Sequence, residues 1–171
     1  SNGGTGTVSQ WAAQFAALVA LAMALAPSVH AQPSDLIEAT RAGDLARVER
    51  LIAANAPLDA QDAAGRSALL IAVDQNHVAI ARALIAAGAG IDMQAANMDT
   101  PWLLAGARGR TDLIREMIPR GPDLSIRNRY GGNALIPACE RAHVETIALL
   151  LTTKIDVDHV NNLGWTCLLE I

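Results

Sequence analysis

Cys139 and His143 are the first pair in this sequence whose types and spacing could do chemistry. Residues four apart lie on one face of a helix, where a histidine can serve as the base for a thiol nucleophile. No third group that would orient the histidine is evident. The spacing therefore favours a structural histidine, and we expect a protein that is not an enzyme.

Metal and cofactor chemistry finds equally little support. His77, His143 and His159 are far apart in the sequence and lack the spacing of metal ligands. The sequence contains no phosphate-binding glycine loop, no catalytic triad and no paired-carboxylate motif. It predicts no cofactor and no metal site, and the remaining histidines are expected to be structural or solvated.

A repeat of 33 residues organises the elements that must position these side chains. A polar residue opens an apolar run once per period, at Ser34, Ser67, Thr100, Asn133 and Thr166. Small and large apolar residues recur in the same register, as in the columns Ala39, Ala72, Ala105 and Ala138, and Leu51, Leu84, Met117 and Leu150. Each opening hydroxyl or amide is placed to cap a short helix.

The rest of each period predicts a second helix and a turn. Gly88 and Gly121 follow the second apolar run and are expected to end that helix in a left-handed conformation. Turn residues such as those of 128–132 then lead to the next cap and predict a β-hairpin-like finger.

A turn and two antiparallel helices every 33 residues, with a cap of the Thr100-Pro101-Trp102-Leu103 type, resemble the ankyrin repeat family. The resemblance spans 34–171 as four full repeats and a truncated fifth. It implies a mainly α solenoid of helix-turn-helix units joined by β-hairpin-like fingers. The family's usual histidine after Thr-Pro-Leu is replaced by apolar residues, so apolar packing must hold the repeats together. The segment 127–143 also resembles exported ankyrin proteins of Gram-negative bacteria.

The repeat register bears on Cys139 and Cys167, which could pair in an oxidising compartment. They lie in successive repeats at non-equivalent positions. Their Cα atoms should therefore be farther apart than the roughly 7 Å that a disulfide can bridge. We predict free, largely buried thiols.

Residues 1–31 have the pattern of a signal peptide. An uncharged apolar run over 15–26 is followed by Pro27 and by Val29-His30-Ala31, with small residues where signal peptidase cleaves. The start, Ser1-Asn2-Gly3, departs from the Met and basic residues that open such signals. Cleavage after Ala31 predicts a periplasmic or secreted protein without stable membrane insertion, and a membrane anchor is the alternative.

The net charge of −4 argues against general nucleic-acid binding, which needs an excess of basic residues. The ankyrin resemblance implies instead a protein partner, bound by the finger tips and the groove-facing side of the first helices. Aromatic and arginine residues dominate such interfaces, and they favour a partner with an acidic patch. The candidate contacts are Arg108, Arg127, Arg129, Tyr130, Glu140, Arg141 and Trp165. A host-delivered effector and a periplasmic small-molecule carrier are the alternative functions.

Overall fold

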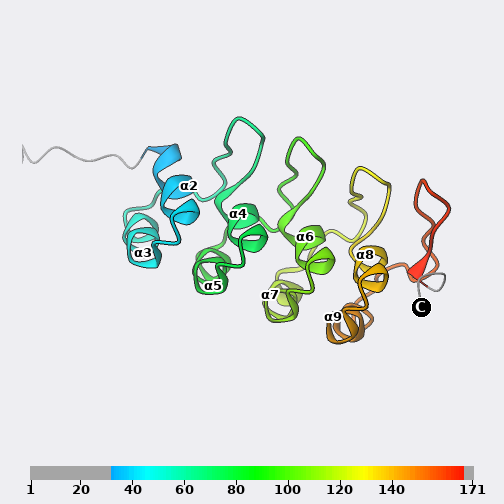
Figure 1. Cartoon of the computed structure of the whole chain (residues 1–171). Coiled ribbons are helices and arrows are strands. Elements are labelled where there is room, and N and C mark those ends of the chain that lie inside the picture. Colours follow the sequence, from blue (N-terminus) through cyan, green and yellow to red (C-terminus); the bar gives the residue numbers. More distant parts are fainter. Residues whose placement is uncertain (1–31, 168–171) are drawn as a thin grey trace, which may run out of the picture. The chain divides into compact units, whose positions relative to one another are not determined.

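The computed structural model describes residues 32–167 as pairs of short helices joined by extended loops (Figure 1). The first helices of the pairs are α2 (Pro33–Arg41), α4 (Ala68–Asp74), α6 (Pro101–Ala107) and α8 (Leu135–Glu140). The second helices are α3 (Leu45–Ala53), α5 (Val78–Ala87), α7 (Thr111–Met117), continued by the 3-10 turn η1 (Ile118–Arg120), and α9 (Val144–Leu150). The signal peptide expected over 1–31 and the fifth helix expected after Cys167 lie outside the described residues.

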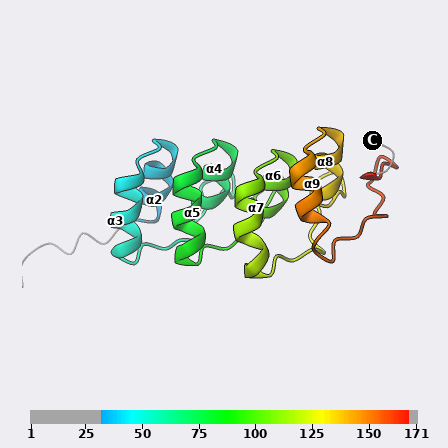
Figure 2. The same ribbon diagram turned by 90° about the horizontal axis from the view of Figure 1, so that it is seen from below.

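The helices form two layers. Each first helix packs against the second helix of its own pair and against the first helices of the neighbouring pairs, and the second helices stack in the same order (Figures 1 and 2). The fingers project beyond the layer of first helices (Figure 1). Across 32–167 there is no β-strand, only an isolated bridge between Gln61 and Ser67. The mainly α fold is confirmed, and none of the helices described is long and apolar enough to cross a membrane.

Ser67 and Thr100 cap α4 and α6 as predicted, and Asn133 lies one residue before Ala134, the residue at the cap position of α8. All three side chains accept N–H groups of the first helical turn. The hydroxyl of Ser67 accepts the N–H of Leu70 at 3.2 Å, and that of Thr100 accepts the N–H of Leu103 at 3.1 Å. Asn133 does the same for α8 through its Oδ1. The prediction is wrong for Ser34, which lies inside α2. That helix starts at Pro33 with Gln32 as its cap, two residues earlier than predicted, because a proline is favoured at the first helical position.

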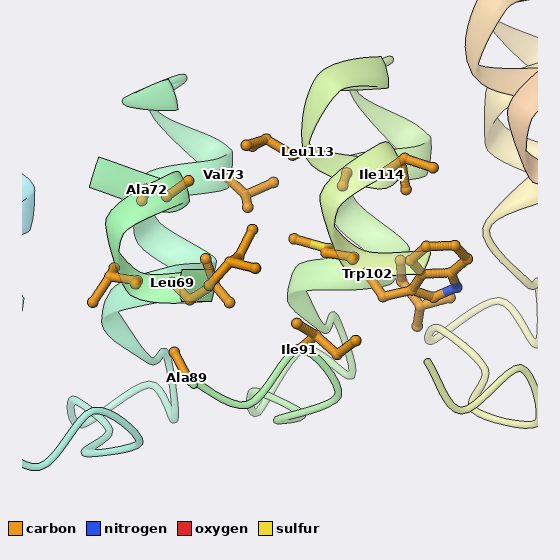
Figure 3. Close-up of a cluster of buried hydrophobic side chains, with 14 of the residues drawn as sticks. Leu69, Ala72, Val73, Ala89, Ile91, Trp102, Leu113 and Ile114 are labelled. Atoms are coloured by element: carbon orange, nitrogen blue, oxygen red, sulfur yellow. The ribbon is translucent and has the colours of Figure 1, made fainter. Parts of the chain in front are cut away.

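Small residues in the first helices allow the repeats to approach closely. The alanines of the column Ala39, Ala72, Ala105 and Ala138 have no exposed surface. Leu84, Met117 and Leu150 are equally buried between the layers. Trp102 fills a core position where the other repeats carry leucine (Figure 3). Because neighbouring repeats bury the same columns, apolar packing holds this stack together.

Glycines end the second helices as predicted. Gly88 has φ 100° and Gly121 has φ 68°, the left-handed conformation that lets the chain leave a helix toward a finger. In the third repeat Pro119 prevents α7 from continuing as an α-helix, since proline has no N–H to donate. The chain finishes that helix as the tighter turn η1.

Cys139 and Cys167 form a disulfide with a Cα–Cα distance of 5.3 Å, so the prediction of free thiols is wrong. The end of each first helix packs against the start of the next, which brings residues 28 positions apart into contact. Gly106 and Ala134 form the preceding pair of this kind, and a Cβ on Gly106 would lie 2.7 Å from the carbonyl oxygen of Ala134. Non-equivalent positions can therefore be closer than equivalent ones.

His77 and His143 are structural. Each precedes a second helix and packs its ring on a glycine of the preceding repeat, His77 on Gly43 and His143 on Gly109. A Cβ on Gly109 would lie 2.6 Å from Nδ1 of His143, so the space belongs to the ring. Because the sulfur of Cys139 is bonded to Cys167, no thiol faces His143.

Candidate functional site

A hollow of about 540 Å³ lies between the fingers and the first helices of the third to fifth repeats. We call it the groove. Six of the seven predicted contact residues line it: Arg108, Arg129, Tyr130, Glu140, Arg141 and Trp165. They come from two consecutive 33-residue periods, and the stacking of one repeat on the next brings them together.

The helix ends and the finger tips position these six side chains. Arg108 and Arg141 are the residues that follow α6 and α8, and Glu140 is the last residue of α8. Tyr130 lies on the fourth finger (residues 124–133) and Trp165 on the fifth finger (residues 155–167). Their side chains are 47% and 42% exposed, so two aromatic rings face solvent at the rim of the groove.

Contacts with neighbouring residues of the same chain hold the arginines of the groove in place. The guanidinium of Arg129 lies 4.7 Å from the centre of the Tyr130 ring, a cation–π contact. Arg108 pairs with Asp74 at 2.7 Å. Arg141 donates from Nη1 to the carbonyl oxygens of Ala107 and Pro137 at 3.2 and 3.4 Å. These contacts fix the direction of the arginines before any partner binds, which lowers the entropy lost on binding.

The groove carries mixed charge with a positive excess. Among its described lining residues, three arginines (Arg108, Arg129 and Arg141) face two carboxylates, Asp99 and Glu140. Burial raises the pKa of the Asp99 carboxyl above its ordinary value, and the positive charge of Arg129 opposes this rise. The groove therefore favours a ligand that brings negative charge to the arginines.

The groove has an apolar floor that the sequence pattern does not predict. Leu104, Ile136 and Pro137 belong to α6 and α8 and line the hollow beneath the charged rim. Ile136 and Leu104 follow the apolar pattern of the repeat, which does not distinguish a core residue from a residue on the floor of the groove. The available signal was their place, three or four residues after the caps Thr100 and Asn133, on the side of the helix that faces the fingers.

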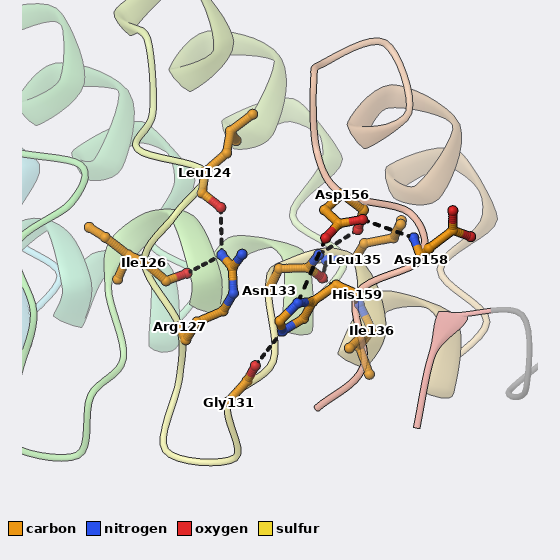
Figure 4. A network of polar contacts seen from close by, with 10 residues as sticks. All are labelled: Leu124, Ile126, Arg127, Gly131, Asn133, Leu135, Ile136, Asp156, Asp158 and His159. Carbon is orange, nitrogen blue, oxygen red and sulfur yellow. Dashed lines mark hydrogen bonds and ion pairs between the residues drawn. The ribbon is translucent and has the colours of Figure 1, made fainter. Parts of the chain in front are cut away.

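Arg127, the seventh predicted residue, does not line the groove. Its Nη1 donates to the carbonyl oxygens of Leu124 and Ile126, within the fourth finger itself (Figure 4). The equivalent residue of the preceding repeat, Gln94, spans the repeats instead and donates to the carbonyl oxygen of Arg127 at 3.0 Å. Arg127 thus stabilises a finger, and the sequence placed it only on the finger edge.

The fifth finger is attached to the fourth by polar contacts. The side-chain amide of Asn133 donates to the carbonyl oxygen of Asp156 at 2.8 Å, and Nε2 of His159 lies 2.6 Å from the carbonyl oxygen of Gly131 (Figure 4). The N–H of Asn162 donates to the carbonyl oxygen of Tyr130 at 2.8 Å. His159 is therefore a structural contact, and residues 32–167 contain no group of three side chains arranged to hold a metal ion.

Comparisons with known proteins agree with this architecture. A family model described as ankyrin repeats in three copies matches residues 36–128. The Escherichia coli K12 ankyrin repeat protein YahD is 35% identical over 144 residues, which are 84% of this chain and 72% of that protein. The chain belongs to the ankyrin repeat family.

Two crystal structures are also similar. The ankyrin repeat protein EF0377 has a TM-score of 0.78 and 41% identity, covering 81% of this chain and 71% of its own. An ankyrin repeat domain from Acinetobacter baumannii AYE has a TM-score of 0.75 and 42% identity, covering 79% and 69%. Proteins of this family are generally protein–protein interaction modules and are typically not enzymes.

Proposed function

We propose that the groove binds an extended segment of a partner protein that carries acidic side chains beside apolar ones. The observation that carries this proposal is the meeting of Tyr130, Trp165 and the groove arginines over an apolar floor. Acidic side chains would pair with Arg129 and Arg141, and apolar side chains would cover Leu104 and Ile136. Aromatic and arginine anchors around such a floor are the composition of an interface centre.

We further propose that the protein works outside the cytoplasm, in the periplasm or after secretion. The disulfide between Cys139 and Cys167 supports this, because disulfides persist in oxidising compartments and are rare in the cytosol. The signal-peptide pattern over 1–31 points the same way. The two arguments are independent, since one rests on the folded repeats and the other on a segment before them.

Peptide display on the oxidised full chain tests the binding proposal. Random peptides are selected on the protein, and the strongest binder is made with a fluorescent label for anisotropy titration. We expect selected sequences in which Asp or Glu alternates with apolar residues. Tyr130→Ala and Arg141→Ala should each weaken binding of that peptide by roughly 1 to 4 kcal/mol without changing the circular dichroism spectrum.

Arg50→Ala is the matched control, because Arg50 is an exposed arginine on α3, in the layer of second helices. It should bind the peptide as the unmodified chain does. If Tyr130→Ala and Arg141→Ala leave the affinity intact while Arg66→Ala destroys it, binding occurs at the first repeats and the groove is the wrong site.

A further inference from the structure

We propose that the disulfide between Cys139 and Cys167 controls the groove, so that the oxidised protein binds its partner more tightly than the reduced protein does. This inference rests on the proposed function of the groove and adds its regulation. Cys139 lies in α8 directly before Glu140 and Arg141, and Cys167 lies two residues after Trp165. The bond therefore joins the helix that forms the floor to the finger that forms one wall.

The fifth finger has little apolar burial of its own to hold it. Ile155 and Cys167 are buried, whereas Val157, Val160, Leu163 and Trp165 are 44%, 55%, 56% and 42% exposed. Ile91 occupies the position of Val157 in an earlier repeat and is only 6% exposed, so the same position is buried there. Among residues 32–167, the hydrogen bonds that attach the finger to the fourth finger and its cap are three, made by Asn133, His159 and Asn162.

The disulfide lies at one end of the segment that carries the groove residues of the fifth finger. Leu163 and Trp165 contribute the fifth finger's apolar surface to the groove, and both lie between the hydrogen-bonded residue Asn162 and the cross-linked residue Cys167. The bond fixes the far end of this segment and keeps these side chains at the groove, whereas a segment without the bond is freer and loses more conformational entropy on binding. The oxidised finger is thus pre-organised for the partner.

The switching reaction is ordinary thiol–disulfide exchange with a dithiol reductant. A thiolate of the reductant attacks one protein sulfur, the bond between Cys139 and Cys167 breaks, and a mixed disulfide forms. The second thiol of the reductant then displaces the protein sulfur. In total, two electrons and two protons pass from the reductant to the protein. The protein then carries two thiols and the reductant carries a disulfide.

Other repeats of this chain show which residues can replace the two cysteines so that the protein should fold without the disulfide. Val73 occupies the position of Cys139 in the second repeat, and Ala134 occupies the position of Cys167 in the fourth, each fully buried. Cys139→Val with Cys167→Ala therefore removes the cross-link and keeps a side chain that this fold already accepts. Cys167→Ala alone is a second variant with the same expected phenotype.

Hydrogen exchange of the full chain tests the release of the finger without any ligand. Reduction by dithiothreitol should speed exchange of the amides of 161–165 by about tenfold or more, while α4 and α5 keep their protection. The doubly substituted chain should exchange as the reduced protein does, with or without reductant. Equal protection of 161–165 in the oxidised and reduced chains would overturn the proposal.

Anisotropy titration with the peptide selected on the oxidised protein tests the consequence for binding. Reduction and the double substitution should each weaken binding by about tenfold, and reductant should not affect the double variant further. If the reduced chain and the double variant bind as the oxidised chain does while Tyr130→Ala still weakens binding, the proposed regulation is wrong and the groove remains the binding site. If Tyr130→Ala and Arg141→Ala have no effect, the proposed function fails, and the regulation of the groove fails with it.

Discussion

The middle of the repeat stack and the fifth finger are built from the same sequence pattern but are held by different forces. Between α4 and α7 the columns of Ala72, Leu84 and Ile114 have no exposed surface, because a repeat covers them on each side. In the fifth finger most apolar side chains are exposed, and polar contacts and a disulfide take over. A repeat in this chain is thus stable through its neighbours, and where packing weakens, specific bonds replace it.

Truncation of Leu84, in the middle of the stack, should have the largest effect on stability. Leu84→Ala removes a fully buried side chain between two repeats and should lower the free energy of unfolding by roughly 2 to 5 kcal/mol. Leu51→Ala, in the same column but only half-buried at α3, should cost about 1 kcal/mol. Urea denaturation followed by circular dichroism measures both, and equal costs at the two positions would show that burial by neighbours does not decide stability.

The cap residues test the polar side of the comparison. Asn133 accepts the N–H groups of Leu135 and Ile136 and also donates to Asp156, which ties the fifth finger to α8. Ser67 makes the cap alone. Asn133→Ala should therefore cost about 2 to 3 kcal/mol, against about 1 kcal/mol for Ser67→Ala. Calorimetric melting of both variants gives these values, and similar losses would mean that the contact with Asp156 adds no stability.

The sequence predicted the regular part of this fold well, because the regular part depends on columns. The 33-residue period located the helix pairs, the alanine column and the ends at Gly88 and Gly121, since each follows from local conformation or from packing between equivalent positions. The pairing of Cys139 with Cys167 was missed because only equivalent positions were compared. The relevant neighbours are offset by 28 residues, as at Gly106 and Ala134.

The groove shows the same division. Exposed aromatic and charged side chains at the finger tips were located by register, and Tyr130 and Trp165 lie at the rim as expected. Arg127 does not line the groove, because a register gives the place of a Cα atom and not the acceptors that a long side chain finds. The two carbonyl oxygens that bind it belong to its own finger, where no sequence pattern marks them. The apolar floor was missed because the helix residues that form it also have the pattern of core residues.

The half-buried carboxylate of Asp92 provides the smallest test, in the middle of the stack. Burial raises the pKa of Asp92 above its ordinary value, and the nearby charge of Asp123 adds to the rise while the N–H of Asp123, 3.0 Å from Oδ2, opposes it. Oδ1 has no hydrogen-bond partner among the described residues. Asp92→Asn keeps an acceptor for that N–H and removes the cost of burying a charge, so it should stabilise the protein at pH 7 by less than about 1 kcal/mol.

The pH dependence distinguishes this explanation from a general effect of the amide. A carboxyl whose pKa is raised on folding binds its proton more tightly in the native state, so the charged form weakens the fold above that pKa. As the pH falls through the raised pKa toward the unfolded value of about 4, the original chain recovers this stability and the advantage of Asp92→Asn should disappear.

Asp59→Asn is the matched control, because Asp59 accepts the equivalent N–H, from Gly90, at 2.7 Å but is exposed. Melting temperatures measured from pH 7 to pH 3 should show a shrinking gain for Asp92→Asn and none for Asp59→Asn. A gain that stays constant over this range would show that the charge of Asp92 costs the middle of the stack nothing.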